Sequence, residues 1–173
     1  GKLITNDTSL SKNDIKNLTN NELQELDINE ILFSSKNIFK FNINKNFKFK
    51  NLDIKSDIDL KKVKIKNFLK LKSVFPQIKK DILFKNQKIK LEYEKDNLNI
   101  VGDGGVLIQN KIDKINYKIF KTKDKVKYNA TYIISKNPFE LNLLNYKKNK
   151  NSDLQLNFKS KKNIKEKFKL CDI

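Results

Sequence analysis

The residues of this chain that could do chemistry begin with two pairs of carboxylates. Asp57 and Asp59 lie two residues apart, and so do Glu92 and Glu94. Paired carboxylates can act as general acid and base. Both pairs lie among lysines, however, and residues at this spacing on a strand share the face opposite the apolar side chains. We therefore interpret both pairs as parts of a solvated polar face.

Other catalytic and metal-binding arrangements lack their residues. The chain has no histidine, which excludes nucleophilic catalysis of the Ser–His type in its usual form. Cys171 is the single cysteine, so it has no partner for an internal disulfide or a zinc site. The sequence therefore predicts a protein that is not an enzyme and that holds no metal and no cofactor.

A glycine cluster, Gly102-Asp103-Gly104-Gly105, is the remaining motif with possible chemistry. Phosphate-binding loops place such glycines before a helix. Here strand-like segments flank the cluster, and the Lys-Ser or Lys-Thr ending of a phosphate loop is missing. The cluster instead predicts a bulge or a sharp twist in a long strand, where Gly102, Gly104 and Gly105 bend the sheet so that one face becomes concave.

The net charge of +18 raises the question of an anionic partner, since lysine neutralises phosphates and releases counterions. A polyanion and an anionic membrane surface are both candidates. Every basic residue is lysine, whereas arginine is the usual reader of base edges. Lysine, asparagine, isoleucine and phenylalanine all have codons rich in A and T, so gene composition explains much of the charge. No specific nucleic-acid partner is expected.

The elements that must position these residues are strands, from about residue 37 onward. Apolar and polar residues alternate there, as in half-buried strands, and the alternation changes parity near Asn51, which predicts a bulge or a turn. Turn signals, including Glu94–Asn97 and Lys121–Lys125, recur roughly every 10 to 14 residues. We expect a mainly β fold, a curled antiparallel meander that forms an open groove or a partial barrel.

Two segments interrupt this pattern. Pro76 near a helix start, with Ile78 and Ile82 four residues apart, predicts one short helix near residues 75–83. Residues 1–36 fit a short helix, an irregular segment or an edge strand. We therefore divide the chain into an N-terminal segment, 1–36, and one β-sheet domain, 37–173, and we expect it to be a piece of a longer polypeptide. No apolar run approaches the roughly 20 residues of a membrane-spanning helix.

The apolar residues of the strands are the candidate binding residues. Phenylalanine is interleaved with isoleucine and leucine at one parity, which favours a core or an apolar ligand over the stacking of bases. Backbone hydrogen bonds between strands allow such a face to be wholly apolar. The candidate groove-facing, lipid-binding residues are Phe39, Phe41, Ile43, Leu91, Tyr93, Ile100, Val106, Ile108, Tyr117, Ile119, Tyr128, Tyr132, Leu156 and Phe158.

Three segments carry a resemblance to a known group. Gly102–Ile108 (GDGGVLI), Asp113–Ile119 (DKINYKI) and Asn137–Tyr146 (NPFELNLLNY) resemble the strand-repeating region of the AsmA/TamB/YhdP-like bacterial envelope proteins. The resemblance implies a periplasmic segment, anchored to the inner membrane through other parts of the chain. It implies binding of phospholipid acyl chains in an apolar groove, a part in phospholipid transport or outer-membrane homeostasis, and neighbouring segments of the same chain as partners.

Three alternatives stay open at this point. A sheet with a filled core and no ligand would be a structural or interaction scaffold. A polyanion-binding module would use the lysines. A fragment of an outer-membrane barrel would need an apolar exterior band with aromatic girdles, whereas the aromatic residues here are scattered along the strands.

Overall fold

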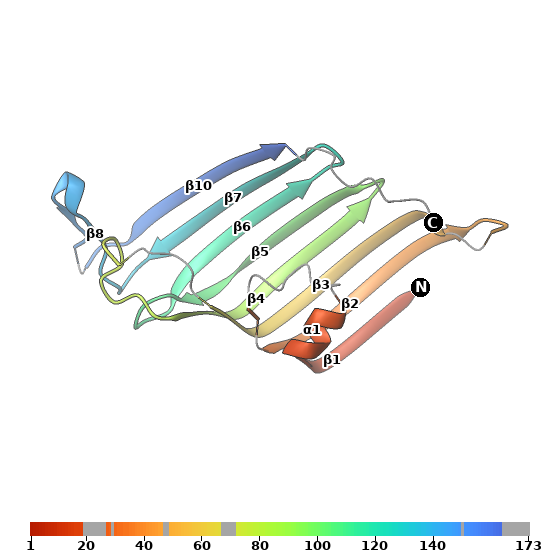
Figure 1. Cartoon of the computed structure of the whole chain (residues 1–173), viewed down its shortest axis with the longest axis horizontal. Coiled ribbons are helices and arrows are strands. Elements are labelled where there is room, and N and C mark those ends of the chain that lie inside the picture. Colours follow the sequence, from red (N-terminus) through yellow and green to blue (C-terminus); the bar gives the residue numbers. More distant parts are fainter. Residues whose placement is uncertain (19–26, 29, 47–48, 67–71, 150, 164–173) are drawn as a thin grey trace.

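The computed structural model describes residues 1–18, 27–28, 30–46, 49–66, 72–149 and 151–163. Most of them form one large sheet of eight strands in the order β1-β2-β3-β4-β5-β6-β7-β10, with every neighbouring pair antiparallel (Figure 1). The sheet is an open meander and does not close into a barrel, as the alternation of apolar and polar residues predicted. The strands are β1 (Lys2–Ser11), β2 (Glu30–Ile43), β3 (Phe49–Lys66), β4 (Asp81–Glu94), β5 (Asn97–Leu107), β6 (Asp113–Lys121), β7 (Lys125–Ile134) and β10 (Leu154–Asn163).

Two of the connections in the second half of the sheet are tight hairpins. Lys95 and Asp96 join β4 to β5 with φ angles of 48° and 64°. A two-residue turn with both φ angles positive matches the right-handed twist of the strands it joins. Between β6 and β7, the backbone N–H of Thr122 donates to the carbonyl of Lys125 over 2.8 Å. Both turns lie where the sequence predicted them.

The register of the sheet shifts at four places, and two of these shifts lie at or beside positions that the sequence singled out. At Asn51 the φ angle is 53°, and the pairing of β2 with β3 shifts between Lys40 and Asn42, so the predicted bulge is present. The second shift lies in β4, between Lys85 and Lys88, and faces the glycine cluster of β5. The glycines themselves continue the strand with no positive φ angle. The bulge expected at the cluster is therefore in the neighbouring strand.

The short helix predicted near residues 75–83 is wrong. The backbone N–H of Ile78 donates to the carbonyl of Phe75 over 3.1 Å, which closes a single turn, and the next N–H, that of Lys79, donates to Ile108 over 2.9 Å. This bond to a distant segment takes the donor that a helix would need. Pro76 fits the turn, because its fixed φ suits the second position of a β-turn. Strand β4 then begins at Asp81.

The N-terminal segment contributes both an edge strand and a helix. β1 pairs with β2, and α1 (Lys12–Leu18) follows it directly. Ser11 and Asp14 cap this helix, since the Ser11 N–H donates to the Asp14 carboxylate over 2.8 Å. Hydrogen bonds from Ser11 lower the pKa of Asp14. β2 begins at Glu30, so the boundary drawn at residue 36 falls inside a strand.

The segment between β7 and β10 leaves the main sheet. It forms a small two-stranded sheet, β8 (Glu140–Leu141) with β9 (Tyr146–Lys147), joined by the 3₁₀ turn η2 (Asn142–Leu144). Figure 1 shows this hairpin beyond one end of the large sheet. Leu143, in the middle of η2, is 92% exposed.

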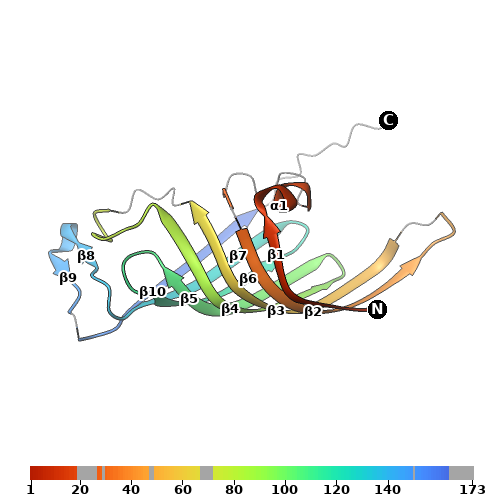
Figure 2. The same cartoon turned by 90° about the horizontal axis from the view of Figure 1, so that it is seen from below.

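Two buried apolar clusters lie on the same face of the sheet. One joins Ile15 of α1 to Ile28 and Val63, and the other joins Phe75 and Phe139 to residues of β4, β5 and β7. The residue pairs Leu10–Ile31, Ile31–Val63, Val63–Phe84 and Phe84–Val106 run across the sheet at one level, so both clusters lie at the same end of the strands. Figure 2 shows α1 standing off one side of the bowed sheet. We call this part of the face the covered end.

Candidate functional site

The other end of the same face carries three rows of apolar side chains. Directly paired residues of antiparallel strands point to the same side, so the register defines each row. None of these side chains is fully buried. We call this surface the open apolar band. Its rows are Phe39, Ile54, Tyr93 and Leu98; then Leu91, Ile100, Ile119 and Tyr128; then Ile58, Ile89, Tyr117 and Phe158.

The structure places most of the sequence-predicted groove residues in or beside this band. Two of these predicted residues in the band are exposed: Tyr128 is 43% exposed and Phe158 is 55% exposed. At the β2 end, the rings of Phe39 and Phe41 stack with their centroids 6.0 Å apart, and Ile43 is 54% exposed. The half-buried members are Phe39, Leu91, Tyr93, Ile100, Tyr117 and Ile119.

Four other predicted groove residues belong to the covered end. Val106 and Tyr132 are buried in the larger apolar cluster, and Ile108 and Leu156 pack against it. Phe75 covers the ring of Tyr132 edge-on at 6.1 Å between centroids. These four side chains belong to or pack against a cluster that includes Phe75 and Phe139 of a second layer over the sheet, so the predicted set is divided between two environments.

A buried polar network fastens that second layer to the sheet. The hydroxyl of Tyr132 donates to the Asp113 carboxylate over 2.6 Å, and the side-chain amide of Asn137 donates to it over 2.7 Å. Burial and the bond to Asp113 raise the pKa of Tyr132 far above its ordinary value. The buried side chain of Gln109 donates to the carbonyl of Pro138 over 2.8 Å and accepts from the Gln77 N–H over 3.1 Å. Sequence reasoning missed this network, because its members come from segments far apart in the chain.

The glycine cluster lies where the open apolar band meets the covered end. A Cβ at Gly102 would lie 2.3 Å from the Tyr117 ring, and one at Gly104 would lie 2.8 Å from the backbone oxygen of Asn86. The side-chain amide of Gln87 lies over Gly104 and donates to the carbonyl of Gly105 over 2.7 Å. In this structure the glycines make room for side chains of the neighbouring strands.

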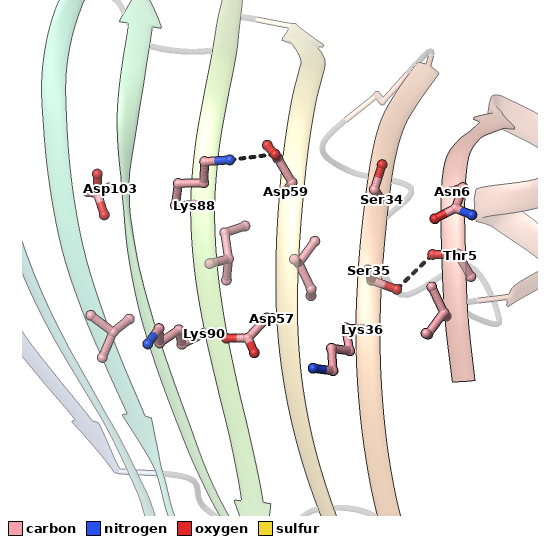
Figure 3. A pocket seen from close by; sticks show the side chains of 14 residues that line it. Thr5, Asn6, Ser34, Ser35, Lys36, Asp57, Asp59, Lys88, Lys90 and Asp103 are labelled. Carbon is pink, nitrogen blue, oxygen red and sulfur yellow. Dashed lines mark hydrogen bonds and ion pairs between the residues drawn. The ribbon is translucent and has the colours of Figure 1, made fainter. Parts of the chain in front are cut away.

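The opposite face of the sheet is polar and is hollowed in two adjoining places. The first hollow, of about 660 Å³, lies over β1 to β5 (Figure 3). Charges of opposite sign alternate across it, since Lys36 faces Asp57, Asp57 faces Lys90, and Lys88 forms an ion pair with Asp59. The second hollow, of about 420 Å³, lies over β5 to β10 and shares Val101 and Asp103 with the first. Sequence alternation predicted the polarity of this face but not its hollows.

Three of the four side chains of the acidic pairs, Asp59, Glu92 and Glu94, form ion pairs with lysines. Asp59 pairs with Lys88, and Glu92 lies 3.7 Å from the ammonium group of Lys55. Within the described residues, no group of three or more histidine, cysteine or acidic side chains is placed to hold a metal ion. The helices of the same part of the chain are all too short or too polar to cross a membrane.

Comparison of the chain with protein-family models, with curated proteins and with solved structures finds no match in any of the three.

Proposed function

We propose that this chain is a non-catalytic sheet segment that binds the acyl chains of lipids along its open apolar band. The observation that carries the proposal is the half-exposed state of the three apolar rows, which cross the strands from β2 to β10. A continuous apolar surface of this kind commonly marks a site for an apolar ligand or partner. Each methylene of a bound chain contributes about 0.8 kcal/mol when it leaves water.

The proposal extends to the setting that the AsmA/TamB/YhdP-like resemblance implies. In that setting the segment lies in the periplasm of an anchored protein, and it contributes to phospholipid transport or outer-membrane homeostasis. Neighbouring segments of the same chain would continue the sheet on either side. The open meander supports this part of the proposal, since such a sheet can add strands at an edge without disturbing its existing pairs.

The test is a charge placed in the middle row. In Ile119→Asp or Tyr128→Asp, an acyl chain would have to desolvate a carboxylate, which costs at least about 1–3 kcal/mol. We expect at least tenfold weaker binding of a fluorescent fatty acid and loss of phospholipid from the native mass spectrum. Ile38→Asp is the matched control, because it makes the same replacement at an exposed isoleucine of β2 on the opposite face. Circular dichroism checks that each variant retains its strands.

Two results would contradict the proposal: equal lipid binding in Ile119→Asp and Ile38→Asp, or a wild-type protein that retains no phospholipid and binds no fatty acid. The second result would favour a scaffold without ligand. Val106 and Tyr132 are packed in a buried apolar cluster at the covered end, and this observation supports a scaffold without ligand as the second candidate function.

A further inference from the structure

Charge is divided unevenly over the polar face of the sheet. Over β2, β3 and β4, lysines and carboxylates alternate from strand to strand, as in Lys36–Asp57–Lys90. Over β6, β7 and β10 the residues of this face include no carboxylate. They are lysine, amide or threonine side chains apart from Phe120 and Ile133. The exposed lysines of this region, which we call the lysine patch, are Lys114, Lys118, Lys127, Lys159 and Lys161.

The lysines of the patch keep their charge available to a partner. None of them forms an ion pair with a carboxylate among the described residues. The hollow of about 420 Å³ lies among them, with Lys118 and Lys159 on its two sides and Asn129 between these in the register. Two strand spacings place β6 and β10 roughly 10 Å apart. A phosphate group between the two lysines would meet positive charge on both sides and the Asn129 amide beneath, with the Asp103 carboxylate at the β5 edge of the hollow.

We infer that the lysine patch docks the protein on an anionic phospholipid bilayer. Charge complementarity selects this partner, because lysine ammonium groups near anionic headgroups gain free energy additively and need no fixed geometry. A second copy of the chain does not fit, since the carboxylates on the polar face of β3 and β4 are interleaved with lysines. A nucleic acid fits less well. The polar face of β6, β7 and β10 has no arginine, and Phe120 is its single aromatic side chain for the stacking of bases.

The inference stands apart from the acyl-chain proposal, because the two use opposite faces of the sheet. The test measures binding to vesicles of phosphatidylcholine with and without phosphatidylglycerol. In the patch variant, Lys118, Lys127, Lys159 and Lys161 are all changed to Gln. Each lysine is expected to change the affinity for anionic vesicles about fivefold. The patch variant should therefore bind these vesicles at least about 100-fold more weakly than the wild type. Added salt should weaken the wild-type interaction by screening.

Two further variants separate the patch from net charge and from folding. The control changes Lys36, Lys55, Lys88 and Lys90 to Gln, which removes the same charge from the alternating half of the face. This control should bind anionic vesicles much more tightly than the patch variant. Changing the four patch lysines to Arg keeps the charge and should keep the binding. Circular dichroism confirms that all three proteins retain their strands.

Three outcomes would overturn the inference. Wild-type binding that is equal with and without phosphatidylglycerol would remove the electrostatic basis. Equal losses in the patch and control variants would show a response to net charge alone. Tighter, patch-dependent binding to an oligonucleotide than to the vesicles at the same salt concentration would assign the patch to a nucleic acid. Each outcome leaves the fatty-acid measurements on Ile119→Asp unaffected, so the two proposals can fail separately.

Discussion

Replacing Asp113 by Asn tests whether the buried polar network holds the covering layer on the sheet. Asp113 is 1% exposed, and its carboxylate accepts from the Tyr132 hydroxyl at 2.6 Å, the Asn137 amide at 2.7 Å and the Ser135 N–H at 3.2 Å. Asparagine has the same shape, but an NH2 group, which only donates, replaces one of the two carboxylate oxygens. At least one of the three donors then faces another donor, and the others lose a charged acceptor.

The magnitude follows from the number and kind of bonds. A hydrogen bond to a charged group contributes about 1.5–3 kcal/mol, and relief from the cost of burying the carboxylate offsets part of the loss. We expect Asp113→Asn to lower the free energy of unfolding by about 2–3 kcal/mol. That is a large share of the roughly 5–15 kcal/mol that holds a typical domain folded.

Urea unfolding followed by circular dichroism at neutral pH measures this loss, with an unchanged slope as the sign that the folded sheet persists. Asp103→Asn is the matched control, since Asp103 is an exposed carboxylate on the neighbouring strand β5 and lies on the other face. It should change stability by less than about 0.5 kcal/mol. If both variants unfold at the same urea concentration, the network does not hold the layer and the reasoning is wrong.

Two further predictions concern the same region. The raised pKa of Tyr132, from an ordinary 10.0, means that the unfolded chain releases this proton at lower pH than the folded protein. The free energy of unfolding should therefore fall as pH rises above about 10, by up to about 1.4 kcal/mol per pH unit. Urea titrations at several pH values should show that it falls less steeply in Tyr132→Phe. Gly104→Ala should destabilise by about 1–3 kcal/mol, because the new Cβ meets the backbone of Asn86, and Gly102→Ala should cost less, because the Tyr117 ring can move. Equal melting temperatures for the two glycine variants would contradict the second prediction.

The strands and most turns were predictable because their signals are local. A period of two, interrupted at Asn51 and at Lys95–Asp96, is a property of adjacent residues, and the backbone follows it in the structure. The prediction of a helix near residues 75–83 was wrong because contacts with distant parts of the chain decide the structure there. There the spacing of Ile78 and Ile82 fits a helix, but the bond from Lys79 to Ile108 and the burial of Phe75 come from distant parts of the chain.

The sequence alone could not predict which part of the apolar face is covered and which part is open. Val106 and Ile100 have the same parity on the same strand, yet Val106 is buried under the covering layer and Ile100 is half-buried in the open apolar band. The difference comes from where residues 72–80 and 135–149 fold back. Those positions depend on Asp113, Asn137 and Gln109, which a reading of the sequence takes for ordinary turn residues. The uneven charge of the polar face likewise requires the register of strands far apart in the chain.

The placement of the two apolar clusters bears directly on how the open apolar band can exist. A sheet with one exposed apolar face would gain little from folding unless another part of that face were covered. Here both clusters lie at one end of the strands, so the packing of Ile15, Phe75 and Phe139 stabilises that end across the width of the sheet. The open apolar band then needs no partner in order to stay folded. Ligand binding and folding are thus separable, and a substitution such as Tyr128→Asp should remove the first while largely sparing the second.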